Sequence, residues 1–163
     1  MTLEEAERFR RLAVPAMSGL HRFARSLTRD RSSADDLLQG TYLRAISHFS
    51  GYAGGDMRAW LVAIMRNLHR SGGGRGVDVP LDEAPEPVDP APGPEREVVA
   101  TDEFAALRAA LDRLPREQAE ALRLREFAGL DYAGIAAAQG VPVGTVMSRL
   151  ARARATLRKD LAP

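Results

Sequence analysis

The stretch GVPVGTVMSRLARAR (residues 140–154) combines a glycine-proline turn with a run of apolar and basic side chains, and it contains no acidic residue. It follows a short apolar segment, DYAGIAAAQ, at residues 131–139. Two helices separated by such a turn form the helix-turn-helix pattern, whose second helix enters the major groove of DNA. The alternative is a solvent-exposed amphipathic helix with an arginine-rich outer face. The turn in front of the helix favours DNA binding.

The second helix of this pattern carries the residues expected to contact DNA. Ile135 and Ala136 are predicted to pack against Val146 and Leu150, and Gly140 suits the left-handed backbone of the turn. The N–H groups at the start of the second helix can bind a phosphate. Arginine donates two hydrogen bonds to guanine in the major groove, and other basic side chains neutralise phosphates. The predicted DNA contacts are Gly144, Thr145, Met147, Ser148, Arg149, Arg152 and Arg154.

The net charge of +1 conceals an uneven distribution of charge along the chain. Residues 1–70 carry 11 basic and 7 acidic side chains, and residues 102–163 carry 10 and 8. Residues 71–101 carry 2 basic and 7 acidic side chains, together with six of the ten prolines. Proline and glycine disfavour regular secondary structure. The sequence therefore predicts two small domains, 1–70 and 102–163, joined by a flexible acidic linker over 71–101.

Both predicted domains are helical. Apolar spacing predicts helices around residues 20–27, 34–49 and 57–68, with Ser32 or Ser33 capping the second of them. Four more helices are predicted after the linker, over residues 104–114, 115–127, 131–139 and 143–161, with Pro115 in the first turn of its helix. No stretch alternates with period two for long enough to predict a strand. The predicted fold class is all-α.

Composition excludes several kinds of function. The chain has no cysteine and only three scattered histidines, so disulfides and a metal site are not expected. It has no apolar run of about 18 residues and no apolar core of a secretion signal, which predicts a cytoplasmic protein without membrane insertion. No nucleophile and base stand in a catalytic pattern, and SGGGRG (71–76) lacks the ending of a phosphate-binding loop. An enzyme, a cofactor and a small-molecule substrate are therefore not expected.

The residues support a resemblance to bacterial RNA polymerase sigma factors of the extracytoplasmic-function (ECF) group. The domain that binds the promoter minus-thirty-five element is similar to LPREQAEALRLREFAGLDY (114–132) and LDYAGIAAAQGVPVGTVMSRLARARATLRKDL (130–161). The helix that binds the polymerase clamp resembles FARSLTRDRSSADDLLQGTYLRA (23–45), and the helix facing the melted minus-ten strand resembles MRAWLVAIMRNLHR (57–70). Two short segments are also similar to the general-stress-response sigma factors of alphaproteobacteria: FARSLTRDRSSADDL (23–37) and RNLHRS (66–71).

The resemblance implies a promoter-specificity subunit that binds core RNA polymerase and promoter DNA and is controlled by an anti-sigma factor. It assigns clamp binding and the minus-ten element to residues 1–70 (sigma region 2), and the minus-thirty-five element to residues 102–163 (sigma region 4). In the implied clamp contact, carboxylates meet arginines of the polymerase while leucines exclude water; its residues are Asp35, Asp36, Leu37, Leu38, Gln39 and Tyr42. The implied minus-ten contacts, in which aromatic rings stack on unpaired bases, are Phe49, Tyr52, Arg58 and Asn67. Trp60 is expected in the core.

Three departures from the family pattern bear on these expectations. Gly40 stands where the clamp helix usually has an acid, and Gly134 replaces a usual glutamate in the helix-turn-helix. HRSGGGRG follows Asn67-Leu68, so the minus-ten helix is predicted to end near Arg70.

Two other functions stay open at this point. A sigma-like mimic that sequesters an anti-sigma factor is favoured by the glycine substitutions. A plain helix-turn-helix regulator would leave DDLLQ (35–39) and RAWL (58–61) unexplained. The acidic linker is expected either to enter polymerase channels that normally hold nucleic acid or to serve as a spacer.

Overall fold

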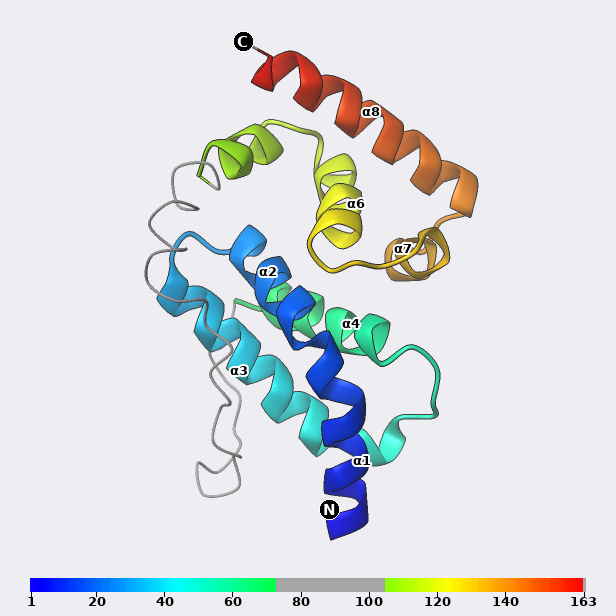
Figure 1. Ribbon diagram of the computed structural model, residues 1–163. Coiled ribbons are helices and arrows are strands. Elements are labelled where there is room, and N and C mark those ends of the chain that lie inside the picture. The colour runs from blue at the N-terminus through cyan, green and yellow to red at the C-terminus, as the bar shows by residue number, and fades with distance from the viewer. Residues whose placement is uncertain (73–104, 163) are drawn as a thin grey trace. The chain divides into compact units, whose positions relative to one another are not determined.

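The computed structural model describes residues 1–72 and 105–162, and every regular element in these ranges is a helix (Figure 1). The chain divides into two compact units, Met1–Val88 and Asp89–Pro163. The all-α prediction is confirmed. Nearly all of the predicted linker, and Phe104 after it, lie outside the described residues.

The first unit is a bundle in which α3 packs against both α2 and α4. Its fully buried side chains include Leu20, Phe23, Leu61 and Met65. Its elements are α1 (Leu3–Ala13), the 3-10 turn η1 (Val14–Ala16), α2 (Met17–Leu27), α3 (Arg31–Ser47), the 3-10 turn η2 (Phe49–Gly51) and α4 (Met57–Arg70).

Helix α1 was not predicted, although its first turn carries a clear start signal. The N–H of Glu5 donates to Thr2 Oγ1 at 3.1 Å, and the N–H of Thr2 donates to Glu5 Oε2 at 2.8 Å. This reciprocal pair is a capping box, which satisfies two N–H groups that a helix start leaves unpaired. Arg10 and Arg11 in the last turn complement the negative end of the helix dipole.

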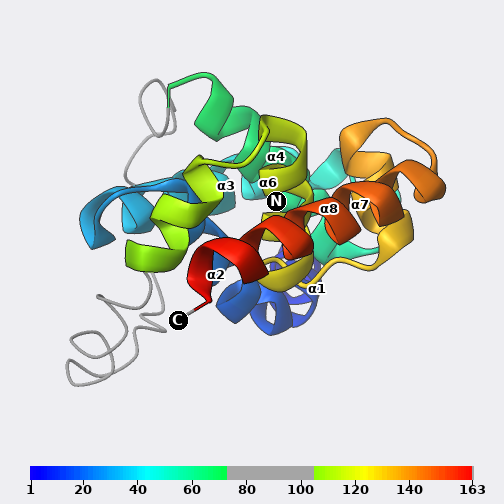
Figure 2. The ribbon, with the colours of Figure 1, turned by 90° about the horizontal axis from the view of Figure 1, so that it is seen from above.

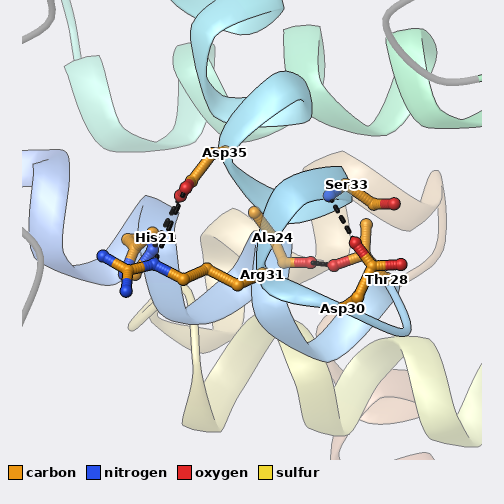
Figure 3. A network of polar contacts seen from close by, with 7 residues as sticks. All are labelled: His21, Ala24, Thr28, Asp30, Arg31, Ser33 and Asp35. Atoms are coloured by element: carbon orange, nitrogen blue, oxygen red, sulfur yellow. Dashed lines mark hydrogen bonds and ion pairs between the residues drawn. The ribbon is translucent and has the colours of Figure 1, made fainter. Parts of the chain in front are cut away.

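The start of α3 corrects the predicted cap. Asp30, rather than Ser32 or Ser33, is the N-cap, and its carboxylate accepts the N–H of Ser33 at 2.7 Å (Figure 3). The helix therefore begins at Arg31, and Asp35 and Asp36 lie in its second turn. Because the dipole effect is confined to the first turn, these two carboxylates are not needed there to stabilise the helix.

Helix α4 ends where the sequence predicts. Asp56 caps its start by accepting the N–H of Arg58 at 3.0 Å. Its last residue is Arg70, followed by the C-cap Ser71 and by Gly72 with a φ of 103°. The prediction of an early end to this helix is confirmed.

The second unit contains the four helices that the sequence predicts after the linker. They are residues 105–112, α6 (Arg116–Glu126), α7 (Tyr132–Gln139) and α8 (Val143–Leu161). Pro115 is the N-cap of α6 and does not lie in its first turn as predicted. Helix α6 packs against α7 and α8 around the buried side chains of Leu124, Leu130 and Leu150.

Candidate functional site

The turn between α7 and α8 has the geometry of a helix-turn-helix. Gly140 has φ 65° and ψ 39°, and the N–H of Val141 donates to the carbonyl of Ala136 at 3.1 Å. Only glycine adopts this left-handed backbone without a steric cost, which confirms the prediction for Gly140. Ile135 and Val146 are fully buried. Figures 1 and 2 show α8 leaving this turn at an angle to α7.

One side of α8 is open to solvent and carries the residue types that bind DNA. Gly144, Ser148 and Arg152 are exposed, and their four-residue spacing places them along one side of the helix. This set is called the reading face below. Pro142 gives the first turn no side-chain cap, and Thr145 is half-buried at the edge of the reading face.

Arg149 is held beside the reading face by a polar relay. Its Nη1 donates to Gln139 Oε1 at 3.1 Å, and Gln139 Nε2 donates to the backbone carbonyl of Glu117 at 3.1 Å. Three helices thus fix the guanidinium, which keeps further N–H donors for DNA. Sequence reasoning missed Gln139, whose only signal is that it is polar at the end of an apolar helix.

Arg154 does not belong to the reading face. Two residues turn an α-helix by about 200°, so Arg154 and Arg152 point to nearly opposite sides. Arg154 Nη2 donates to Glu126 Oε1 in an ion pair of 3.1 Å, and the hydrogen bond to Glu126, followed by that to Tyr132, raises the pKa of Arg154. Met147, exposed by 54%, lies two turns before Arg154 on the same side. The structure therefore ties Arg154 to α6 and does not bring it to Ser148 and Arg152.

The predicted clamp residues divide between the surface and the core. Asp35, Asp36 and Gln39 are exposed on α3. Leu37 and Leu38 are only 1% and 7% exposed, because α3 is packed between α2 and α4. The expectation that these leucines cover a partner is therefore not supported, and the exposed part of the predicted surface is polar.

The two carboxylates on α3 differ in their surroundings, and Figure 3 shows Asp35 beside His21 and Arg31. Asp35 lies 3.5 Å from Nε2 of the buried His21 and 3.8 Å from Nε of Arg31. No side chain of the part of the chain that the structure describes pairs with Asp36. Of these two carboxylates, Asp36 is therefore the one without a charged partner among the described residues.

Tyr42 is the last of the predicted clamp residues, and its hydroxyl faces inward. The oxygen is buried and has no hydrogen-bond partner among the described residues. Burial raises the pKa of the Tyr42 phenol above its usual range, because the phenolate would lose its hydration. The hydroxyl is therefore not presented to a partner.

A Tyr42→Phe variant is expected to be at least as stable as the wild type at neutral pH, because it removes a buried unpaired hydroxyl. Above about pH 10 the unfolded chain loses the phenol proton while the folded chain keeps it, so this residue lowers stability as the pH rises. The stability of the variant should therefore fall less than that of the wild type as the pH rises above about 10. Urea unfolding at pH 8 and pH 10.5 measures both effects, and a large loss of stability at pH 8 would show that the hydroxyl is hydrogen-bonded.

The predicted minus-ten rings are packed against other rings. Phe49 and Tyr52 are 3% and 8% exposed and stack with ring centroids 5.7 Å apart. Phe9 meets Phe49 edge-on at 5.3 Å, and the half-buried Trp60 lies 5.0 Å from Tyr52. These rings are called the aromatic cluster below. The expectation that Phe49 and Tyr52 offer open faces to unpaired bases is not met, since neighbouring side chains cover them.

The aromatic cluster fixes the loop at residues 48–56. Tyr52 donates its hydroxyl proton to the carbonyl of Gly55 at 2.6 Å. Gly54 and Gly55 both have a φ of 94°, a conformation that favours glycine. The rings thus shape the loop that leads into α4.

Arg58 and Asn67 emerge from different sides of α4. Nine residues separate them, which turns a helix by about two and a half turns. Arg58 is half-buried in the first turn, and Asn67 is exposed near the end. The structure does not bring these two predicted minus-ten residues together.

The second unit also has an open apolar cavity of about 500 Å³ that sequence reasoning missed. Its apolar lining comes from residues 105–112, from α6 and from the end of α8, where Leu161 is 50% exposed. Arg154 and Arg158 lie at the same cavity. The signal in the sequence is the apolar spacing of Leu150, Leu157 and Leu161, which continues past the buried part of α8.

Metal-binding and membrane-spanning features are absent from residues 1–72 and 105–162. No three acidic or histidine side chains in these ranges come together as a metal site. No helix in them is long and apolar enough to cross a membrane.

Two protein-family descriptions match the chain: Sigma-70 region 2 over residues 16–71, and Sigma-70 region 4 over residues 104–157. The chain is 39% identical over 148 residues to the ECF RNA polymerase sigma factor EcfG of Rhodopseudomonas palustris, covering 88% of this chain and 80% of that protein. It is 37% identical over 147 residues to the ECF RNA polymerase sigma factor SigE of Mycolicibacterium smegmatis, covering 88% of this chain and 57% of that protein.

Two solved structures share the fold. The sigma factor RpoE of Bartonella quintana, in complex with the anti-sigma factor NepR, has a TM-score of 0.68 at 24% identity, over 95% of this chain and 97% of that one. CnrH, in complex with the cytosolic domain of CnrY, has a TM-score of 0.71 at 24% identity, over 94% and 87%. The matches to the two regions and the 39% identity to EcfG together show that this chain belongs to the ECF group of RNA polymerase sigma factors.

Proposed function

We propose that this sigma factor binds core RNA polymerase and the promoter minus-ten element through residues 1–70, and the minus-thirty-five element through residues 102–163. The observation that carries most of the proposal is the helix-turn-helix, whose exposed reading face is bordered by a pre-positioned arginine. Members of the family are not enzymes, so their function depends on binding to polymerase and DNA. Residues 71–101 would join the two binding domains.

The proposed polymerase contact is the exposed side of α3, formed by Asp35, Asp36 and Gln39. A carboxylate without an internal partner gains most from an arginine on a binding partner. Asp36 meets this condition within the described residues. The buried Leu37 and Leu38, and the ring of Tyr42 packed against Phe9, would hold α3 in place beneath this surface.

The proposed minus-ten contacts are Arg58 and Asn67, with the loop at residues 48–56 between α3 and α4. Phe49 and Tyr52 would act by fixing that loop, since they are covered in the aromatic cluster. Helix α4 ends at Arg70, and the basic residues of its last turn are His69 and Arg70. More of the promoter affinity would then rest on the minus-thirty-five domain.

The proposed regulator is an anti-sigma factor. The solved relatives RpoE and CnrH are bound to NepR and to the cytosolic domain of CnrY, respectively. We place this chain in the cytoplasm, where sigma factors generally act, and in a stress response, because EcfG is among its relatives and the sequence resembles the general-stress-response type.

The two alternative functions are less well supported. A plain regulator does not account for the match to Sigma-70 region 2 over residues 16–71. The case for a mimic rests on Gly40 and Gly134, yet α3 runs through Gly40, and the N–H of Gly134 donates to the cap Asp131 at 2.7 Å. Neither glycine disrupts its helix.

Binding to core RNA polymerase is the first test of the function. The purified chain and core enzyme are mixed and separated by size exclusion, and the complex is then supplied with a randomised promoter library. Co-elution and enrichment of a two-element promoter are expected. A folded chain that does not bind core enzyme would overturn the proposal and point to the mimic, or to a plain regulator if DNA still bound.

Arg152→Ala and Arg149→Ala are each expected to weaken minus-thirty-five binding by about 5- to 100-fold, because an arginine paired with a base is worth about 1–3 kcal/mol. Arg154→Ala is the matched control, since it removes the same charge from the same helix on another side. The dissociation constants of the variants for a duplex holding the selected minus-thirty-five element measure the effect. Equal losses in all three variants would indicate only general electrostatic attraction.

A further inference from the structure

Helix α1 contacts the loop at residues 48–56, although it lies outside the residues that match Sigma-70 region 2, which begin at 16. Phe9 inserts its ring against Phe49 at 5.3 Å and against Tyr42 at 6.4 Å. It thereby joins α1 to the aromatic cluster. The residue before it, Arg8, is brought to the same loop.

The Arg8 guanidinium lies over two rings of the aromatic cluster. Its Cζ is 5.5 Å from the ring centroid of Phe49 and 5.8 Å from that of Tyr52. Both distances are within the range of a cation–π interaction, which is worth about 0.5–1 kcal/mol at an exposed site. Since Tyr52 is itself fixed by Gly55, the rings hold this cation beside the loop.

The charge of Arg8 is not neutralised by any residue that the structure describes. Arg8 is exposed, and across residues 1–72 and 105–162 no carboxylate pairs with it. A ring attracts a cation but carries no net charge, so the guanidinium keeps its capacity to bind an anion. Because the rings restrict its motion, less conformational entropy is lost when it binds.

We propose that Arg8 binds a phosphate of the unpaired promoter strand next to the loop at residues 48–56. The proposal rests on the proposed minus-ten function of the first unit. It adds a DNA contact from α1, which neither the family match nor the sequence resemblance assigns. It also gives the covered rings Phe49 and Tyr52 a role, as the support that positions this cation.

The test compares the wild type with Arg8→Ala, Arg8→Lys and Arg10→Ala, each assembled with core RNA polymerase. Arg10 is the matched control, because it is an exposed arginine of the same helix but has no ring beneath it among the described residues. The DNA is a forked duplex whose minus-ten strand is unpaired, with the promoter sequence that the wild-type holoenzyme selects from a random library. Affinity is measured between about 50 and 200 mM salt.

Arg8→Ala is expected to weaken binding of the forked DNA by about 3- to 10-fold. It should also make the slope of log K against log salt concentration shallower by about 0.7, the value for one single-strand phosphate contact. Arg8→Lys should fall between it and the wild type, because an ammonium keeps the charge without stacking flat on the rings. Arg10→Ala should stay within about twofold of the wild type. Permanganate reactivity of unpaired thymines should follow the same order.

Three results would overturn the proposal. If Arg8→Ala and Arg10→Ala weaken binding of the forked DNA equally, Arg8 contributes only general electrostatic attraction to DNA. A loss of core-enzyme binding with unchanged DNA affinity would assign Arg8 to an acidic protein surface. If Arg8→Ala does not fold, the Arg8→Lys variant decides. A lysine variant that binds the forked DNA as tightly as the wild type, with a different dependence of affinity on salt, would show that stacking on the rings does not position the cation for this contact. A wild-type chain that forms no holoenzyme would instead refute the proposed function itself.

Discussion

Reversing the charge of Asp36 to arginine is expected to weaken binding to core RNA polymerase by about 30-fold or more, equivalent to roughly 2 kcal/mol. Asp36 is exposed on α3, and no side chain in the described residues pairs with it. An arginine at this position would repel the basic groups that the resemblance places on the polymerase clamp and leave them unpaired. Because the Asp36 carboxylate is exposed and pairs with no described side chain, the fold should be unchanged.

Glu7→Arg is the control for this prediction, because Glu7 is exposed on α1 and its reversal changes the net charge equally. Fluorescence anisotropy with labelled protein measures the affinity of each variant, and circular dichroism verifies the fold. Asp35→Arg should also weaken binding, but with a loss of thermal stability, since Asp35 pairs with His21 and Arg31. Core affinity that is unchanged in Asp36→Arg would remove α3 from the polymerase interface.

Phe9→Ala is expected to lower the free energy of unfolding of the first unit by about 3–5 kcal/mol, the usual cost of deleting a buried phenylalanine ring. Phe9 is 8% exposed and meets two rings edge-on. Small domains are stable by only about 5–15 kcal/mol, so the variant would unfold readily. The loss would also free the loop at residues 48–56.

Urea unfolding followed by tryptophan fluorescence suits this measurement, because Trp60 is the one tryptophan of the chain and lies in the aromatic cluster. Leu3→Ala is the matched control, since Leu3 is an apolar residue of the same helix that is 83% exposed. Its effect should be within about 0.5 kcal/mol. If Phe9→Ala costs no more than Leu3→Ala, α1 is not packed on the unit in solution.

Features that depend on a few neighbouring residues could be predicted from the sequence. The turn at Gly140 follows from a glycine between two apolar segments, and its left-handed backbone is found where predicted. The end of α4 at Arg70 follows from the glycines after it. Both features depend on the local backbone conformation, which the pattern of neighbouring residues predicts directly.

Features that depend on tertiary packing could not be predicted in this way. The leucines at 37 and 38 are adjacent, and both are buried because α3 is packed on two sides. Phe49 and Tyr52 are covered by Phe9, which comes from a helix forty residues away in the chain that no pattern linked to them. Residue type suggested a base-stacking surface, and only the packing shows which side chains lie over the rings.

The relay that holds Arg149 bears on how promoter preference can change during evolution. Gln139 is anchored to a backbone carbonyl of α6, so residue 117 can vary without releasing the guanidinium. Among the described residues, Arg149 is the one predicted DNA contact to which Gln139 is hydrogen-bonded. A substitution there would release that arginine while leaving every other DNA-facing side chain unaltered. Divergence of target sites between related sigma factors can thus begin at a position that comparisons of DNA-contacting residues would overlook.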